Sequence, residues 1–200
     1  VRQRVGKMRR CCVALMIGAL LFISGCGASE KQESLAANLA GAETFNITGE
    51  IIVDYGDRVS EFTLNYEGGA DGGTITVLEP ETIAGVQLEL KDGSVMMKFD
   101  GFLLDSGELS GGLTPLSAIP TLANAMKNGY LTESGKDRLG DEDCTRLTYQ
   151  PVGAEYENML CSIWVADDTA KPVYGEISAD GRTVIKCTFT EFSAAGEGID

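Results

Sequence analysis

Apolar and polar residues alternate with a period of two over much of this chain, and this pattern restricts its fold more than any other feature. The clearest example is residues 86–99, VQLELKDGSVMMKF, where apolar residues fall on every second position on both sides of Asp92-Gly93. Period-two alternation is typical of half-buried strands, and an Asp-Gly pair between two such runs favours a tight turn. The stretch therefore predicts a β-hairpin.

Similar patterns, bounded by turn residues, predict strands elsewhere. Ala179-Asp180-Gly181 is the expected turn of a final hairpin. The further strands are expected at residues 49–56, 61–68, 74–80, 102–109, 144–150, 160–167, 172–178 and 183–192. So many short strands indicate an antiparallel sheet.

Two segments have helical spacing instead. The first, residues 34–45, has Leu35, Leu39 and Ala42 on one face. The second, LTPLSAIPTLANAMKNG at 113–129, predicts a helix with an N-cap at Thr114, Pro115 in the first position, a break or kink at Pro120 and an end at Gly129. Strands with one-sided helices indicate an α+β fold with a single antiparallel sheet and helices on one face.

The first residues resemble the signal of bacterial lipoproteins. A basic stretch is followed by the apolar run CCVALMIGALLFI and then by Ile23-Ser24-Gly25-Cys26. We expect a signal peptide at 1–25, a lipidated and palmitate-bearing Cys26, a flexible tether at 26–34, one domain at 35–192 and a mobile tail at 193–200. The expected location is the extracytoplasmic face of a cell membrane.

Charge narrows the choice of partners. Five of the 16 basic residues and none of the 30 acidic ones precede Cys26, so the chain from Cys26 onward carries 11 basic against 30 acidic residues, a formal charge of −19. Such a surface repels phosphate backbones, so we expect no nucleic-acid partner. It also repels anionic lipid head groups, so the acyl anchor is expected to hold the membrane.

Catalytic chemistry finds little support. The chain has no histidine, which removes the most common general base and metal ligand. Acidic pairs such as Asp167 and Asp168 stand beside predicted turns, where aspartate suits the backbone geometry. We expect no enzyme activity, no cofactor and no metal site.

Three stretches resemble the half-barrel family of lipoprotein carriers, the outer-membrane lipoprotein localisation factors and their relatives. They are SLAANLAGAETFNITGEI (34–51), LKDGSVMMKFDGFLLDSGEL (90–109) with the proline-containing helix after it, and SIWVADDTAKPVYGEISADGRTVIKCTFTEF (162–192). Length and anchor are similar to the germination lipoproteins of spore-forming bacteria. The arginine that marks the soluble carriers has no clear counterpart in this sequence.

The resemblance implies a strongly curved antiparallel sheet, a half-barrel, whose concave face is covered by helices. It also implies a membrane-anchored protein that holds a lipid or other apolar ligand there. The alternative is a non-catalytic docking or activating partner of another envelope protein, such as a cell-wall or germination enzyme. The expected ligand-lining residues are Met97, Phe99, Phe102, Leu116, Ile119, Leu122 and Met126.

A cross-strand disulfide between Cys144 and Cys161 is a further hypothesis. A tight turn at Pro151-Val152-Gly153-Ala154 would place the two cysteines opposite each other on a non-hydrogen-bonded pair, within disulfide reach. Cys187 would then be free. The competing interpretation is three free buried cysteines that act as small apolar residues.

Overall fold

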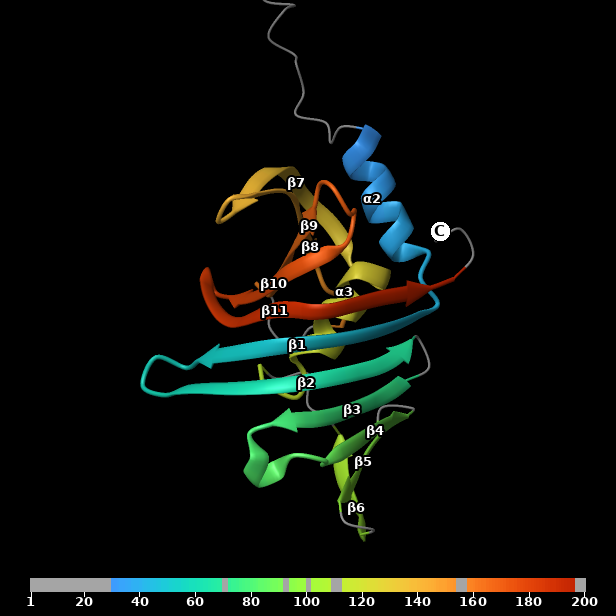
Figure 1. The fold of residues 1–200 in the computed structure, drawn as a ribbon, viewed down its shortest axis with the longest axis vertical. Helices are drawn as coiled ribbons and strands as arrows, with labels where there is room; N and C mark the ends of the chain where they lie inside the picture. Colours follow the sequence, from blue (N-terminus) through green and yellow to red (C-terminus); the bar gives the residue numbers. More distant parts are fainter. Residues whose placement is uncertain are drawn as a thin grey trace, which may run out of the picture.

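The computed structural model describes residues 30–69, 72–91, 94–99, 102–108, 113–153 and 158–196, with 102–108 described by their backbone alone. Over these residues the chain forms one antiparallel sheet of eleven strands, two α-helices and a short 3-10 helix (Figure 1). In chain order the elements are α2 (Glu30–Ala40), β1 (Thr44–Asp54), β2 (Val59–Gly69), β3 (Gly72–Glu79), η2 (Glu81–Ile83), β4 (Gln87–Lys91), β5 (Ser94–Phe99), β6 (Phe102–Glu108), α3 (Ala118–Asn128), β7 (Tyr130–Leu139), β8 (Glu142–Gln150), β9 (Leu160–Ala166), β10 (Pro172–Ala179) and β11 (Arg182–Ala195).

The sheet consists of two meanders that meet in its middle. Its strand order is β6-β5-β4-β3-β2-β1-β11-β10-β9-β8-β7. The first and last strands of the chain, β1 and β11, pair from Thr44 opposite Ala195 to Val53 opposite Ile185. This long-range pairing joins β1–β6 to β7–β11, so the antiparallel sheet expected from the sequence is confirmed.

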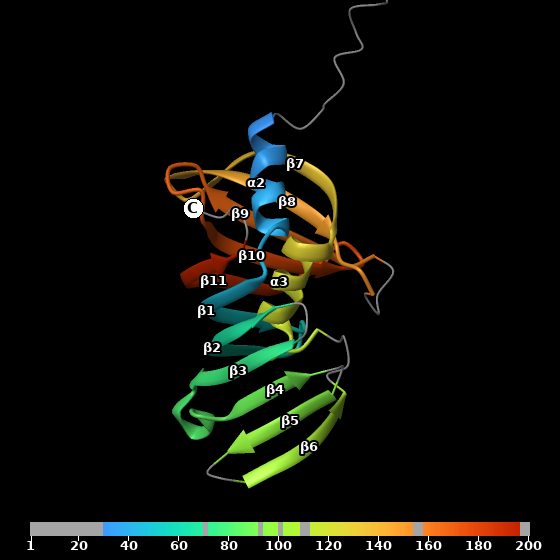
Figure 2. The same cartoon turned by 90° about the vertical axis from the view of Figure 1, so that its right-hand side faces the viewer.

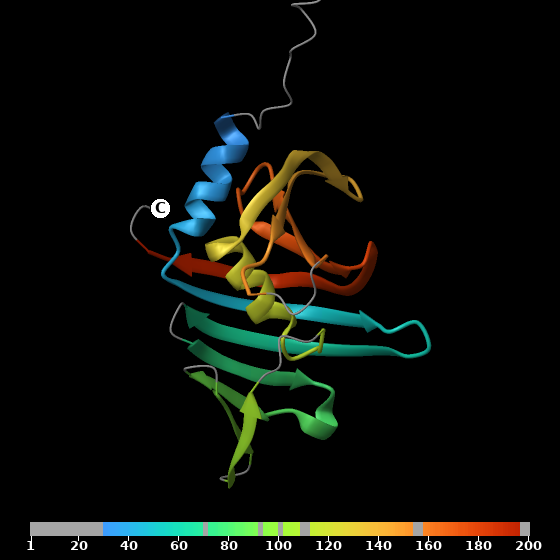
Figure 3. The ribbon, with the colours of Figure 1, turned by 180° about the vertical axis from the view of Figure 1, so that it is seen from behind.

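Both helices lie on the same side of the sheet (Figures 2 and 3). α3 packs against the central strands β1, β2 and β8–β11, and α2 packs beside it over β7 and β8. We call the side of the sheet that α3 contacts the helix face, and the opposite side the outer face. None of the helices in the described part of the chain has the length and hydropathy needed to cross a bilayer.

The start of α3 differs from the expectation. The helix begins at Ala118, and Thr114 to Ser117 form a turn in which the Ser117 N–H donates to the Thr114 carbonyl at 3.2 Å. Pro120 therefore falls in the first helical turn, where no hydrogen bond to an earlier carbonyl is lost, and no break follows. The expected end at Gly129 is confirmed.

The ends of the domain also differ from the expected boundaries. Residues 30–34, which the sequence assigned to the tether, belong to α2 because Gln32 is already buried against the domain. At the other end β11 continues to Ala195 and stays paired with β1, so residues 193–195 are strand and not tail.

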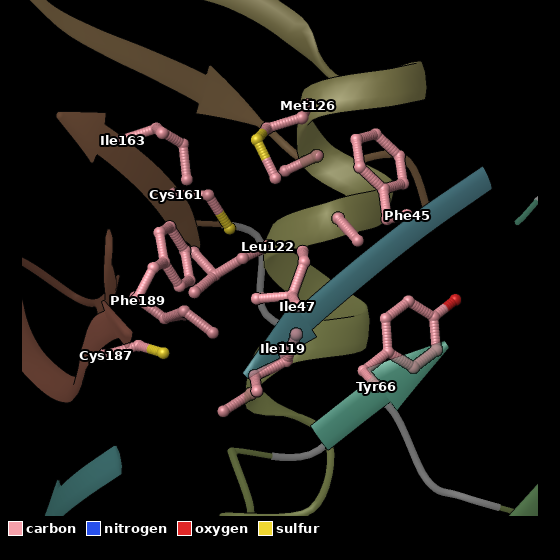
Figure 4. Close-up of a cluster of buried hydrophobic side chains, with 14 of the residues drawn as sticks. Phe45, Ile47, Tyr66, Ile119, Leu122, Met126, Cys161, Ile163, Cys187 and Phe189 are labelled. Atoms are coloured by element: carbon pink, nitrogen blue, oxygen red, sulfur yellow. The ribbon is translucent and has the colours of Figure 1, made fainter. Parts of the chain in front are cut away.

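Side chains from α3 and the sheet form the core (Figure 4). Ile119, Leu122 and Met126 are at most 1% exposed. Gly175 lets the helix approach the sheet closely, because a Cβ there would lie 2.9 Å from Leu122 Cδ1. A larger residue would push against the helix. Gly49 makes room for the Cys187 thiol, whose Sγ would lie 2.7 Å from an added Cβ, and the Ile119 Cδ1 packs over it at 3.5 Å.

Candidate functional site

The expected ligand-lining residues fall into two groups. Three of them, Ile119, Leu122 and Met126, are core side chains between α3 and the sheet. Their burial contributes about 1.5–3 kcal/mol each, so a ligand could reach them only by displacing α3 against that cost. These positions hold the domain together.

The other group consists of three residues on the strands β5 and β6 at one end of the sheet, together with Leu116. Met97 is half-buried on β5, and Phe99, two residues further on the same face, is 46% exposed. Leu116, just before α3, is half-buried and packs against the core. Phe102 pairs with Phe99 in the backbone register, and its side chain lies outside the described residues. Met97 and Phe99 lie on β5, which is not among the strands that α3 packs against.

A groove opens on the outer face of the sheet, where the sequence predicted no site. Its volume is about 580 Å³. It is lined by Glu50, Ile51, Ile52, Glu61, Phe62, Thr63, Glu79, Pro80, Tyr174, Lys186 and Thr188. We call this set the outer groove.

Strand register explains how residues so distant in sequence meet there. In one row Glu50 of β1 lies between Thr188 of β11 and Thr63 of β2, and Thr63 pairs in turn with Glu79 of β3. In the neighbouring row Ile52 of β1 lies between Lys186 of β11 and Glu61 of β2. Because strand side chains alternate between faces, Glu50 and Ile52 point away from α3.

The outer groove carries excess negative charge. It contains three carboxylates, from Glu50, Glu61 and Glu79, against the single ammonium of Lys186. No ion pair among the described residues involves any of these four side chains. Thr63 Oγ1 donates a long hydrogen bond of 3.4 Å to Glu79 Oε2.

Aromatic side chains border this groove on the β10 side. The rings of Tyr174 and Trp164 pack edge to face with centroids 5.3 Å apart. The Tyr174 hydroxyl donates to Glu176 Oε1 at 2.9 Å, and Trp164 Nε1 donates to Asp137 Oδ2 at 3.0 Å. These hydrogen bonds hold the two rings in place on the outer face.

Asp167, one of the turn aspartates noted in the sequence, has a structural role. Its carboxylate accepts hydrogen bonds from Lys136 Nζ at 2.6 Å and Thr145 Oγ1 at 2.9 Å, and Lys31 Nζ lies 3.9 Å away. The Lys136 hydrogen bond is the main cause that holds the pKa of Asp167 below its ordinary value. The network links α2, β7, β8 and the turn after β9. No sequence motif predicted it.

The sheet edge at β7 is poorly suited to adding a strand from a partner. A β-bulge interrupts the β7–β8 pairing between Leu131 and Glu133, and Lys136 lies exposed further along the strand. α2 packs alongside, with Ser134 Oγ donating to Gln32 Oε1 at 3.2 Å. Bulges, charges and covering helices are common means of blocking edge-to-edge pairing.

The proposed Cys144–Cys161 disulfide is wrong. Cys144 pairs with Ala166, and Cys161 pairs with Tyr149, five residues from Cys144 along β8. An odd separation places the two thiols on opposite faces of the sheet. The connection is longer than the tight turn assumed: Gly153 has the expected positive φ of 72°, but β9 begins only at Leu160.

All three cysteines in the described residues are free and buried. Burial raises the pKa of the Cys161 thiol to about 12 and raises the pKa of Cys187 as well. Protonated, enclosed thiols are poor nucleophiles, so these residues act as small apolar side chains. The described residues also contain no group of three or more acidic or cysteine side chains that could hold a metal ion.

Solved structures similar to this chain include three from bacterial proteins. One is an outer membrane lipoprotein-sorting protein domain from Vibrio parahaemolyticus (10% identity, TM-score 0.47, covering 86% of this chain and 95% of that chain). Another is the LolA superfamily protein NE2245 from Nitrosomonas europaea (13%, 0.43, 82% and 93%). A third is a chain in the structure of the CwlD amidase from Clostridioides difficile in complex with the GerS lipoprotein (14%, 0.42, 86% and 99%).

No family model and no curated protein matches the chain. At these identities and scores the similarity to lipoprotein-carrier-like folds concerns the arrangement of helices and strands alone.

Proposed function

We propose that this protein is a non-catalytic docking protein, anchored through acyl groups on Cys26 at the extracytoplasmic face of a membrane. Its partner is another envelope protein, which binds at the outer groove. One observation carries this choice: α3 and the sheet bury the central residues expected to line a ligand site, whereas a groove of about 580 Å³ opens on the outer face.

A half-barrel curvature of the sheet is part of this proposal. α3 packs against six adjacent strands, β2, β1, β11, β10, β9 and β8. Six strands span about 24 Å in a flat sheet, whereas a helix of this length is about 16 Å long. A sheet that bends around the helix brings all six strands within its reach.

Carriage of a lipid or other apolar ligand is the second candidate. The exposed Phe99 and the half-buried Met97 favour it, because they lie on the helix face at the β4–β6 end, away from the strands that α3 covers. A ligand would bind there without displacing α3.

Two measurements on the full-length lipoprotein separate these functions. A photo-crosslinking residue at Ile52, in the outer groove, should give a discrete crosslinked protein in intact cells, and the same residue at exposed Ile83 serves as the matched apolar control. A fluorescent fatty acid should show no saturable binding to the purified protein. Saturable binding that Phe99→Ala abolishes, with no crosslink specific to Ile52, would instead establish ligand carriage.

A further inference from the structure

We infer that the outer groove binds a lysine- or arginine-bearing segment of the partner protein. The inference rests on the proposed function, since it specifies the chemistry of the segment that docks in this groove. Charge complementarity within the groove supports it, together with the apolar surface between the charges.

The three carboxylates surround one part of the groove. Glu50 pairs with Thr63, and Glu61 pairs with Ile52, so the two glutamates are diagonal neighbours across β1 and β2. Glu79 pairs with Thr63 from the other side of β2 and is a diagonal neighbour of Glu61. Diagonal neighbours have Cα atoms about 7–8 Å apart, within reach of one extended cationic side chain.

One positive charge lies near these carboxylates, against three negative ones. Lys186 pairs with Ile52 on the β11 side and is the single basic residue among the groove residues. Neither Glu50 nor Glu61 forms an ion pair with another described residue. The free groove therefore keeps a net negative charge, which an incoming cation neutralises and an incoming anion opposes.

The outer groove also has apolar surface beside the carboxylates. Ile52, which is 42% exposed, lies in the row between Lys186 and Glu61, and Pro80 and Tyr174 also line the groove. Lysine and arginine side chains combine an apolar stem with a charged end, and can therefore cover Ile52 while reaching a glutamate. Arginine can also form a bidentate pair with a carboxylate.

Other occupants fit this combination less well. An acyl chain would leave three carboxylates facing apolar groups without compensation. A phosphate-bearing ligand would meet the same carboxylates as like charges. The volume of about 580 Å³ suits a ligand of several groups. A basic protein segment satisfies both the charge and the volume.

The test uses the full-length lipoprotein in non-ionic detergent and a fluorescein-labelled peptide, Arg-Leu-Arg-Leu-Arg, followed by fluorescence anisotropy. The double variant Glu50→Gln/Glu61→Gln removes two groove carboxylates. The double variant Glu89→Gln/Glu142→Gln removes two exposed carboxylates elsewhere and has the same net charge. Hydrogen bonds to charged groups predict that the groove variant weakens binding about tenfold or more, and the control less than about twofold.

Each outcome decides the inference. Equal losses in the two variants would overturn it, because binding would then follow net charge alone. Equally tight, groove-dependent binding of spermidine would overturn the protein-segment assignment in favour of a small polyamine. Groove-dependent peptide binding without an Ile52 crosslink in cells would support cation binding and contradict the docking function. A crosslinked partner whose attached segment has no basic residue would leave the docking function intact and refute this inference.

Discussion

Truncating Leu122 to alanine tests whether α3 is a fixed part of the core or a removable cover over a binding site. The Leu122 side chain is fully buried, and its Cδ1 lies 2.9 Å from the place where a Cβ on Gly175 would stand. Leu122→Ala leaves a cavity bounded by the backbone of β10 and by Phe189, whose ring reaches the same place. A paired strand cannot move into that space, so the cavity remains largely open.

The expected loss follows from this geometry. Buried leucine-to-alanine changes cost about 2.7–5.0 kcal/mol, with the larger values at sites that cannot collapse. For Leu122→Ala we expect about 3–5 kcal/mol. For a protein of this size that loss lowers the melting temperature by roughly 6–20 °C. Leu122→Asp should destabilise further, because it also buries an unpaired charge.

Thermal and urea unfolding of the purified protein, followed by circular dichroism, measure this loss. Asn124→Ala is the matched control, because Asn124 lies exposed on the same helix, and it should change stability by less than about 0.5 kcal/mol. A Leu122→Ala melting temperature within a degree or two of wild type would refute the packing argument. In that case α3 would be loosely held, and a ligand could bind beneath it.

Three further predictions concern the anchor, an ion pair and the thiols. Cys26→Ala should abolish labelling with a fatty-acid analogue, and unchanged labelling would contradict the lipid anchor. Asp167→Asn removes the ion pair with Lys136. Because folding lowers the pKa of Asp167, the ion pair stabilises the folded protein above the ordinary aspartate pKa of 3.8, and this stabilisation is lost as the pH falls below that value. The free energy of unfolding, measured with urea at neutral pH and at pH ~3, should therefore fall less with acidification in the variant than in wild type. An equal fall in the two proteins would argue against this ion pair. Alkylation without reductant should spare Cys144 and Cys161 in the native protein and modify both in urea, whereas a peptide map with the two bridged would restore the disulfide hypothesis.

Local patterns predicted the parts of the fold that depend on neighbours in sequence. The two strands predicted within residues 86–99 pair in the expected register, with Leu88 opposite Met97, and the Asp92-Gly93 turn lies outside the described residues. Asp180 and Gly181 both have positive φ, as a two-residue hairpin turn requires, and their strands meet at Ala179 and Arg182. The apolar face of α3 was also predicted correctly, because one side of a helix must be buried wherever the helix lies.

The β8–β9 pairing shows where such patterns fail. Gly153 adopts its expected turn conformation, yet the strands resume pairing five residues out of the predicted register. Alternation fixes which residues share a face only after the length of the connection is known. The predicted Cys144–Cys161 bridge depended on that length, which the sequence left open.

By itself, the sequence determined the strand-rich class, the local hairpins, the amphipathic helix and the surplus of negative charge, because each follows from residues that are close together or from composition. The tertiary structure determined that the outer groove forms and that three of the predicted ligand residues belong to the core. Glu50 and Glu61 meet Lys186 only because β1 pairs with both β2 and β11, the latter more than 130 residues away. Ile119, Leu122 and Met126 are core rather than ligand contacts because α3 lies directly on the sheet over Gly49 and Gly175. Both outcomes depend on long-range pairing and packing, which no local periodicity encodes.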